Sequence, residues 1–572
     1  MKTAILSLLS ILFISSNIFA QKVQFEWATS FGGKYEDQGK SIVVDDLGNI
    51  YTTGYIQDTV DLNPDAQIFD FHYPYGYRDV YISKFDSSGK LISAISMGAC
   101  DWDQGNSLTI DDFGNIYSIG NFNDTIDFDP GPGVYDLSSN GSSDFFITKY
   151  DSSLNFVWAK SIGGNYIFGD AGYSIAIDTF GNVYTTGCFN GTVDFDSGAG
   201  IYELTARGLT DIFISKLDNF GNFVWARNIG YNEWNQGNSL VCDYAGNVYV
   251  TGFFSGTIDF NTDTVETFYL SSNGGYDIFV LKLDKAGKFK WAHSMGGVLW
   301  DESHSVDIDA RGNIYLTGRF SSIVDFDPDS TEVYTLSSSG SFDIFILKLD
   351  SLGNFVWAKN IGGNSEDTGY SLKLDTLGNI YSTGFYSGAV DFDPGFQEFE
   401  LSIGGCYFLK LDSNGTFIWA AGIGGNADDH GNSINIDSDG NVYSTGFVWG
   451  GVDLDPTAGE FYTSTVNGSK DVFILKLSQR FPDINEISET NFLPEISIYP
   501  NPAKDFTQID FGNNYFSGSV EILGISGQVF INRNFTNSQK IDINIQNLAY
   551  GIYFARIVTT DNQMFVQKFV KI

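Results

Sequence analysis

The sequence predicts an all-β fold built from one repeated unit, and three observations support this prediction. The 572 residues include 64 Gly, 50 Phe and 31 Tyr, while charged residues make up only 18%. Aromatic residues favour strands, and Gly favours the tight turns that join them. A Gly-Asn pair recurs seven times at intervals of 62 to 67 residues, with short apolar runs at the same places around each pair. Repetition of one small β unit is therefore expected. The pairs begin at Gly48, Gly114, Gly181, Gly246, Gly312, Gly378 and Gly440.

Each copy contains four strand-like segments, which in the fifth copy are residues 305–309, 313–320, 343–350 and 354–358. An Asp-x-x-Gly-Asn turn, as at 437–441, joins the first segment to the second, and Asp-x-x-Gly joins the third to the fourth in most copies. The Asp side chain can bond its own turn and Gly accepts a positive φ, so each junction is expected to be a tight hairpin. Each copy then forms a four-stranded antiparallel meander, the size of one β-propeller blade.

The two ends of the repeat region predict that the array closes into a ring. The last copy stops after its third segment, 471–477, and an isolated fourth segment, 24–28, precedes the first copy. Pairing these segments would remove two exposed sheet edges. The sequence therefore predicts a seven-bladed β-propeller over residues 21–479, closed by the N-terminal strand; a linear solenoid is the alternative.

The repeat resembles a known bacterial family. The pattern Gly-x-Ser-Ile-x-x-Asp, Gly-Asn-x-Tyr-x-Thr-Gly, Asp-x-Phe-x-x-Lys-Leu and a trailing Gly-Gly is similar to the SBBP-type β-propeller repeat, over residues 22–478. An Asp-x-Asp-Pro insertion between the second and third segments departs from that pattern. The resemblance implies a fold and no particular activity.

The segments outside the repeats predict export. Residues 1–20 have the Lys, apolar stretch and small final residue of a signal peptide, and no later segment is apolar enough to span a membrane. After a linker, 480–495, short alternating runs in 496–572 predict a small C-terminal β-sandwich, with strands at 519–523, 528–531, 541–545, 552–558 and 563–572.

This C-terminal region also resembles a known domain. Residues 498–502, 526–527, 548–554 and 567–572 are similar, in the same order, to the type A sorting domain of the type IX secretion system of Bacteroidota. The resemblance implies that the type IX secretion machinery is a partner, and that the protein is secreted or placed on the outer cell surface.

Composition excludes several other roles. A net charge of −39 opposes binding to nucleic acid, since phosphate contacts need clustered Lys and Arg. The four Cys residues are far apart and fit neither a disulfide framework nor a metal site. No cofactor is predicted to be required.

Calcium is the one candidate ion. The insertion opens with paired acidic or amide residues, whose alternate side chains point the same way and could offer two oxygen ligands. The alternative is that these side chains cap their own turns. The calcium candidates are Asp127, Asp129, Asp325, Asp327, Asp391 and Asp393. A second ring of acids precedes the first segment of each copy, and either forms an acidic funnel or fixes the loops.

Residues that break the repeat symmetry are the better candidates for ligand binding. Trp102, Trp234 and Trp300 share one loop position in three copies only, and the first copy adds His72 and Tyr75. Aromatic rings beside carboxylates can stack on sugars or anchor a protein partner; alternatively, they pack over their own loops.

These features predict a non-enzymatic module that binds a glycan or a protein. The sequence contains only four His, and no HExxH, Gly-x-Ser-x-Gly or phosphate-loop motif. Two alternatives stay open: a polysaccharide hydrolase or lyase with its site at the channel mouth on the loop-rich face, and a purely structural surface protein.

Overall fold

The computed structural model describes two compact units, Met1–Phe481 and Pro482–Ile572. The described residues are 22–63, 71–72, 76–166, 169–262, 266–329, 331–425, 428–457, 469–480, 496–512, 515–524, 529–559 and 564–572. Every regular element among them is a β-strand. No described segment forms a helix with the length and apolar character needed to cross a membrane. The predicted signal peptide lies outside the described residues.

The described part of the first unit contains seven four-stranded antiparallel sheets, numbered here in chain order. Sheet 1 is β2 (Gln38–Val44), β3 (Ile50–Ile56), β6 (Asp79–Phe85) and β7 (Leu91–Met97); sheet 2 is β8 (Gln104–Ile110), β9 (Ile116–Phe122), β12 (Asp144–Tyr150) and β13 (Phe156–Ile162). Sheet 3 is β14 (Ala171–Ile177), β15 (Val183–Phe189), β18 (Asp211–Leu217) and β19 (Phe223–Ile229); sheet 4 is β20 (Gln236–Cys242), β21 (Val248–Phe254), β24 (Asp277–Leu283) and β25 (Phe289–Met295).

The remaining sheets of this unit have the same strand order. Sheet 5 is β26 (Glu302–Ile308), β27 (Ile314–Phe320), β30 (Asp343–Leu349) and β31 (Phe355–Ile361); sheet 6 is β32 (Thr368–Leu374), β33 (Ile380–Tyr386), β36 (Gly405–Leu411) and β37 (Phe417–Ile423). Sheet 7 is β38 (His430–Ile436), β39 (Val442–Trp449), β40 (Lys470–Arg480) and β1 (Lys22–Phe31).

The insertion between the second and third strands forms small two-stranded sheets in six copies, among the described residues. The repeat pattern did not predict these small sheets. They are β4 (Val60–Asp61) with β5 (Phe71–His72), β10 (Thr125–Asp127) with β11 (Asp136–Ser138), β16 (Thr192–Asp194) with β17 (Glu203–Thr205), β22 (Thr257–Asp259) with β23 (Tyr269–Ser271), β28 (Ile323–Asp325) with β29 (Thr335–Ser337), and β34 (Val390–Asp391) with β35 (Glu400–Leu401).

The first hairpin of each sheet forms as its turn residues predict. In sheet 1, the carboxylate of Asp45 accepts hydrogen bonds from Leu47 N at 2.9 Å and Asn49 N at 2.8 Å, and Tyr51 Oη donates to it at 3.1 Å. One side chain therefore replaces backbone partners that the turn lacks.

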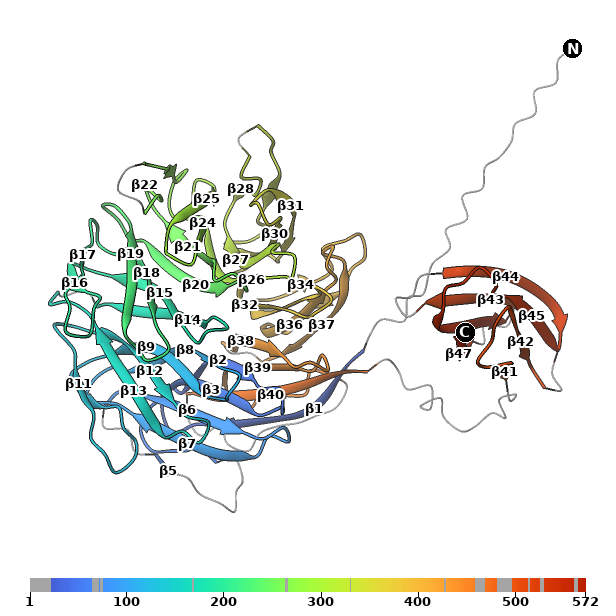
Figure 1. Ribbon diagram of the computed structural model, residues 1–572, viewed down its shortest axis with the longest axis horizontal. Helices are drawn as coiled ribbons and strands as arrows, with labels where there is room; N and C mark the ends of the chain where they lie inside the picture. Colours follow the sequence, from blue (N-terminus) through green and yellow to red (C-terminus); the bar gives the residue numbers. More distant parts are fainter. Residues whose placement is uncertain are drawn as a thin grey trace, which may run out of the picture. The chain divides into compact units, whose positions relative to one another are not determined.

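The first strand of each sheet, called here the inner strand, contacts the inner strands of both neighbouring sheets, and β38 contacts β2. Figure 1 shows these strands nearest the common centre of the sheets. Serines of the inner strands link neighbouring sheets: Leu108 N donates to Ser41 Oγ, and Ile42 N donates to Ser433 Oγ, both at 3.2 Å. The second bond joins sheet 7 to sheet 1. Gly39 permits this approach, since a Cβ there would lie 2.2 Å from Thr445 Oγ1.

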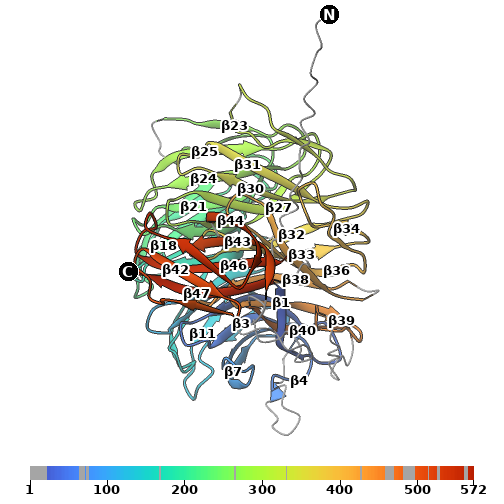
Figure 2. The same cartoon turned by 90° about the vertical axis from the view of Figure 1, so that its right-hand side faces the viewer.

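The predicted pairing of the N-terminal segment with the last repeat segment is present. Strand β1 lies antiparallel to β40, with Ser30 opposite Phe473 and Trp27 opposite Lys476 (Figure 2). The strand extends beyond the predicted 24–28 on both sides. It buries Phe31, which is 2% exposed.

Neighbouring sheets also interlock at their outer strands. Trp27 packs on the third-to-fourth turn of sheet 1, where a Cβ on Gly89 would lie 2.8 Å from the indole. Sheet 1 itself has Ser93 at the position of Trp27, as the cross-strand partners Lys84 and Lys476 show. The facing turn of sheet 2 has Leu154 in place of Gly, and Leu154 is 4% exposed at φ 63°. Leu154 thus occupies the space that a Trp fills elsewhere.

The lysine of each third strand stacks on the tyrosine of its own second strand. Lys216 Nζ lies 4.6 Å from the Tyr184 ring centroid and Lys84 Nζ lies 5.1 Å from that of Tyr51. Lys84 also donates to Ser152 O of the next sheet at 2.8 Å. The repeated lysines are therefore structural cation–π contacts.

The second unit contains two further sheets around one apolar core, which includes Ile509, Val520, Ile543 and Ile557. Strands β41 (Ser497–Tyr499), β42 (Phe506–Asp510) and β45 (Lys540–Asn544) form one sheet; β44 (Val529–Ser538), β43 (Phe516–Gly524), β46 (Gly551–Thr559) and β47 (Met564–Lys571) form the other. Figure 2 shows β43, β44, β46 and β47 side by side.

Candidate functional site

The inner strands enclose a central cavity of about 400 Å³ that is lined by residues of all seven sheets. Each inner strand contributes its serine to the lining. These residues are Ser41, Ser107, Ser174, Ser239, Ser305, Ser371 and Ser433.

A buried acidic or amide side chain precedes each inner strand and fixes the loops at one end of the sheets. Asp103 Oδ2 accepts from Ala99 N at 2.7 Å and Oδ1 accepts from Asn123 N at 2.8 Å, which ties the segment before β8 to the segment after β9. We call this end of the sheets the loop face. The seven residues are 0 to 1% exposed, so they fix loops and do not form an acidic funnel: Asp37, Asp103, Asp170, Asn235, Asp301, Asp367 and Asp429.

Many of these acids have a second buried acid beside them, at the start of the preceding sheet's third strand. Burial, followed by the charge of Asp79, raises the pKa of Asp103 to about 7. Burial and the nearby Asp301 likewise raise the pKa of Asp277 to about 7. Asp277 accepts from Asn273 N at 3.0 Å, and its buried Oδ1 has no hydrogen-bond partner among the described residues.

These carboxyl groups predict that stability falls as the pH rises from about 5 to 8. Native Asp277 and Asp103 keep their protons at pH values where unfolded aspartates, with a pKa near 4, have lost them. Their contribution is fully present below about pH 4 and is lost as the pH rises through about 7. We expect Asp277→Asn to reduce this loss by about 1 kcal/mol or more, because it removes one titrating group. Chemical denaturation at about pH 5 and about pH 8 measures the free energy of unfolding of both proteins.

An exposed aspartate supplies the matched control for this prediction. Asp46 lies in the first turn of sheet 1 and is exposed, so Asp46→Asn should leave the pH dependence unchanged. An equal slope in Asp277→Asn and the unmodified protein would contradict the assignment of raised pKa values.

Trp102 lies on the loop face and is 52% exposed. The Arg78 guanidinium lies between two rings, 4.2 Å from the Trp102 ring centroid and 4.1 Å from that of Tyr55. Arg78 also pairs with Glu36 at 3.1 Å. The indole is therefore held in place by a cation and remains accessible to a ligand.

Trp300 and Trp234 occupy the equivalent loops of sheets 5 and 4, and are 56% and 39% exposed. Trp300 stacks on Tyr276 with centroids 5.9 Å apart, and Tyr276 packs on Phe253 at 4.7 Å. Trp102 and Trp300 therefore do more than pack over their own loops. Each rests on a side chain of the preceding sheet and stays about half exposed.

His72 lies in the insertion of the first copy, apart from the loops that carry the tryptophans. His72 lies in β5, and its Nδ1 is 2.7 Å from Ser96 Oγ in the outermost strand β7. The three tryptophans instead lie on loops that directly precede inner strands. Tyr75 lies outside the described residues.

The calcium candidates cap turns. Asp127 Oδ1 accepts from Asp129 N at 3.0 Å and from Tyr135 N at 2.8 Å. Equivalent bonds hold the other pairs, in which Asp327 N donates to Asp325 at 3.1 Å and Asp393 N donates to Asp391 at 3.0 Å. Within the described ranges, no group of three or more His, Cys, Asp or Glu side chains is arranged to hold a metal ion.

Calcium binding stays a prediction with a direct test. An ion that binds only the folded protein raises its melting midpoint. We expect EDTA to lower the midpoint of the purified protein if the aspartate pairs hold calcium, and added calcium to restore it. An unchanged midpoint would leave turn capping as the role of these residues.

A second group of residues, which the repeat pattern did not indicate, lies on the loop-face half of the inner strands. The third residue of the inner strand is Asn in three sheets, where its amide bonds the next inner strand, as Asn432 Nδ2 does to Gly39 O at 2.7 Å. The other four sheets have Lys40, Tyr173, His304 and Tyr370 there. Comparing the copies position by position would have revealed this departure from symmetry.

His430, the first residue of β38, packs on Tyr370 of this group, with ring centroids 5.4 Å apart. Its ring centroid is 4.6 Å from those of Phe385 and Phe447, and its Nε2 is 2.8 Å from Asp428 Oδ1. Burial lowers the pKa of His430 against the opposing effect of Asp428. An imidazole that donates from Nε2 to a carboxylate presents Nδ1 as a proton acceptor.

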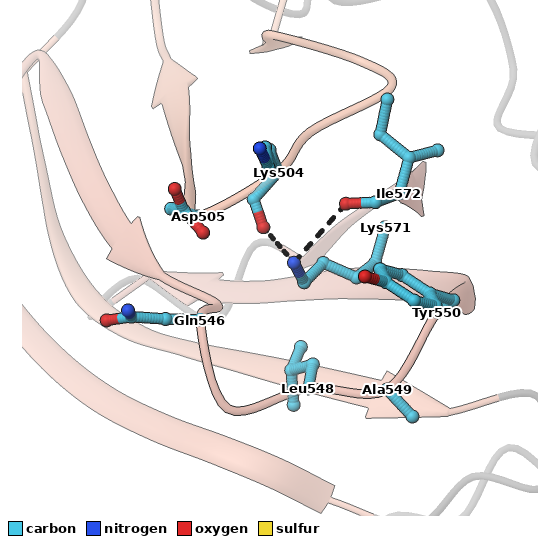
Figure 3. A pocket seen from close by; sticks show the side chains of 8 residues that line it. All are labelled: Lys504, Asp505, Gln546, Leu548, Ala549, Tyr550, Lys571 and Ile572. Carbon is cyan, nitrogen blue, oxygen red and sulfur yellow. Dashed lines mark hydrogen bonds between the residues drawn. The ribbon is translucent and has the colours of Figure 1, made fainter.

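The second unit has its own pocket of about 310 Å³. Figure 3 shows the ammonium of Lys571 donating to the carbonyl oxygens of Lys504 and Ile572. Lys571 is 5% exposed, so its charge fastens the last strand to the segment before β42. The lining residues are Lys504, Asp505, Gln546, Leu548, Ala549, Tyr550, Lys571 and Ile572.

Comparison with known proteins gives two similar curated sequences. The chain is 24% identical over 552 residues to an uncharacterized WD repeat-containing protein of Acanthamoeba polyphaga mimivirus, covering 82% of this chain and 38% of that protein. It is 29% identical over 112 residues to the regulatory protein FlaEY of Caulobacter vibrioides, covering 20% of this chain and 12% of that protein. The chain thus spans well under half of either relative.

Solved structures give weak similarity. Sqt1 from Chaetomium thermophilum has a TM-score of 0.36 at 10% identity, covering 80% of this chain and 100% of that one. The PQQ domain of pyranose dehydrogenase from Coprinopsis cinerea has a TM-score of 0.30 at 9% identity, covering 79% and 97%. Similarity at this level does not indicate a function.

Two family models match parts of the chain. Residues 26–59 match a model described as a beta-propeller repeat, SBBP. Residues 497–572 match a model described as a secretion system C-terminal sorting domain. The chain therefore carries an SBBP β-propeller repeat and ends in a type IX secretion sorting domain, which indicates interaction with that machinery and export to the cell surface or beyond.

Proposed function

We propose that sheets 1 to 7 are the blades of a closed seven-bladed β-propeller over residues 21–479, and that residues 496–572 form a β-sandwich after a linker at 480–495. The contact of β38 with β2 and the pairing of β1 with β40 support the closed ring. Residues 1–20 serve as the signal peptide in this proposal.

We propose further that the exported propeller is a non-enzymatic binding module for a glycan. The observation that carries this proposal is the pair of half-exposed indoles, Trp102 and Trp300, each held by a side chain of the preceding sheet. A ring fixed on one side loses little side-chain entropy when a sugar stacks on its other side. A protein partner that uses the same rings is an alternative outcome of the test.

A glycan array with a triple Trp→Ala variant tests this function. We expect the intact protein to bind one class of glycan, and the Trp102, Trp234 and Trp300 variant to lose about tenfold or more in affinity, the effect of removing aromatic anchors. The matched control replaces three aromatic residues at first-hairpin turns with Ala. These are Phe113, Phe180 and Tyr244, which are 86%, 78% and 88% exposed.

Three results would contradict the proposal. Equal binding by the Trp variant and the intact protein would exclude the aromatic site, and an equal loss in the control variant would indicate non-specific stacking. Absence of any binding would favour the purely structural role.

The arrangement of His430 supports a second candidate, a polysaccharide hydrolase or lyase at the channel mouth. A neutral imidazole oriented by Asp428 can accept a proton from a substrate. Release of oligosaccharide products from a panel of polysaccharides, abolished by His430→Gln, would support this candidate over simple binding.

A further inference from the structure

We infer that the loop-face end of the cavity, where sheets 7 and 1 meet, binds an anionic group, a carboxylate or a sulfate, on the sugar of a glycan. This inference deepens the proposed function and rests on it. It identifies the ligand class as an acidic polysaccharide, with the anionic group next to Lys40.

Lys40 occupies the inner-strand position where three sheets have Asn. Lys40 Nζ donates to Gln38 Oε1 at 2.8 Å, and it lies 5.7 Å from the Tyr55 ring centroid. The next residue, Ser41, lines the central cavity. Lys40 thus directly precedes the lining residues of its strand, with an uncharged amide as its hydrogen-bond partner.

Two more cations surround Lys40, and each has its own acidic partner. Arg78 pairs with Glu36 at 3.1 Å, and Lys470 pairs with Asp428 at 3.3 Å. Lys40 differs from both, because no carboxylate among the described residues lies within ion-pair distance of it. An arriving carboxylate or sulfate would supply that partner.

The charges around Lys40 also favour binding of an anion. Burial, together with the charges of Arg78 and Lys470, lowers the pKa of Lys40 to about 8, against a smaller opposing effect of Glu36. The ammonium therefore lies in locally cationic surroundings, in a chain whose net charge is −39. A bound anion would relieve this repulsion, whereas it would be repelled elsewhere on the acidic surface.

Aromatic rings beside these cations suit a sugar. Lys470 Nζ lies 4.4 Å from the centroid of Phe447, which also packs on His430. Tyr55 carries Arg78 on its ring and links this place to Trp102 through the same guanidinium. A charged sugar at Lys40 and a second sugar at Trp102 could therefore belong to one polymer.

The test compares charged and neutral polymers on Lys40→Met, which keeps an unbranched side chain one atom shorter and removes the charge. We expect the ratio of affinity for polygalacturonate to affinity for its neutral methyl ester to fall about tenfold, as the loss of one charge-assisted hydrogen bond predicts. A sulfated dextran beside plain dextran separates sulfate from carboxylate as the preferred group. The matched control is Lys373→Met, since Lys373 lines the same cavity but pairs with Asp307 at 3.8 Å.

A second measurement does not depend on polymer binding. Monomeric galacturonate, but not galactose, should slow acylation of Lys40 by an amine reagent, as followed by mass spectrometry. Protection of Lys40 without any polymer binding would refute the proposed glycan function and keep the anion site. An unchanged affinity ratio in Lys40→Met together with no protection of Lys40 would overturn the inference. An equal loss in Lys373→Met would also overturn it. In both cases the proposed glycan binding would still be judged by the triple Trp variant.

Discussion

Removal of residues 22–33 is expected to lower the midpoint of thermal unfolding by about 10 °C or more, or to prevent folding. Strand β1 pairs with β40 along its length and buries Phe31. Loss of a buried Phe alone costs about 3 to 5 kcal/mol, and a change of about 1 kcal/mol shifts the midpoint by about 2 to 4 °C in domains of 150 to 250 residues. Differential scanning calorimetry of the protein with and without the strand measures the shift.

Rescue in trans makes this prediction specific. A synthetic peptide of residues 22–33, added to the truncated protein, should restore part of the lost stability as its concentration rises, because it binds the folded state. The control peptide carries Phe31→Asp, which places a charge among the buried residues Phe85 and Val472. An unchanged midpoint after truncation, or equal rescue by both peptides, would contradict closure of the ring by this strand.

The repeats predicted the strands well where apolar residues alternate with turns. The predicted segments 313–320 and 343–350 correspond to β27 and β30 within one residue at each end. The inner strand of the fifth copy is predicted at 305–309 but begins at Glu302, because its first three residues, Glu302, Ser303 and His304, are polar. Polar residues at the start of a strand carry no periodic apolar signal. The same limit explains why β41 and β42, beside Pro500 and Pro502, were not predicted.

The candidate site was predictable only in part, because its contacts cross between sheets. The shared loop position of Trp102 and Trp300 could be read from the repeat spacing. The support of Trp102 by Arg78 could not, since the two residues belong to different sheets. His430 and Lys40 were missed for the same reason: 390 positions separate residues that lie in adjacent inner strands. The contact of β38 with β2 brings them together, and the spacing of residues within one repeat does not indicate it.

The outer interface between sheets 1 and 2 allows a prediction about packing that uses the chain's own variation. Every sheet except sheet 1 has a Trp opposite the lysine of its third strand. The turn that faces this position, between the third and fourth strands of the next sheet, contains Gly in the other copies that have such a turn. Sheet 2 has Leu154 there, and sheet 7 has no such turn because its fourth strand is β1. Ser93→Trp alone should destabilise the protein by about 1 to 3 kcal/mol, since the indole would overlap Leu154. Leu154→Gly alone should cost about 2 kcal/mol, because the cavity it leaves outweighs relief of the positive φ.

The double variant Ser93→Trp with Leu154→Gly recreates the Trp27 and Gly89 arrangement and should recover most of both losses. The expected coupling between the two changes is about 1 to 3 kcal/mol, as for residues in direct contact. Urea denaturation of the four proteins gives this coupling directly. Additive losses would mean that the two side chains do not share one space, and that the interlocking of neighbouring sheets is looser here than at Trp27. A positive coupling would show that Ser93 in sheet 1 and Leu154 in sheet 2 compensate for each other. Trp beside Leu154 overfills the interface, and Gly beside Ser93 leaves it empty.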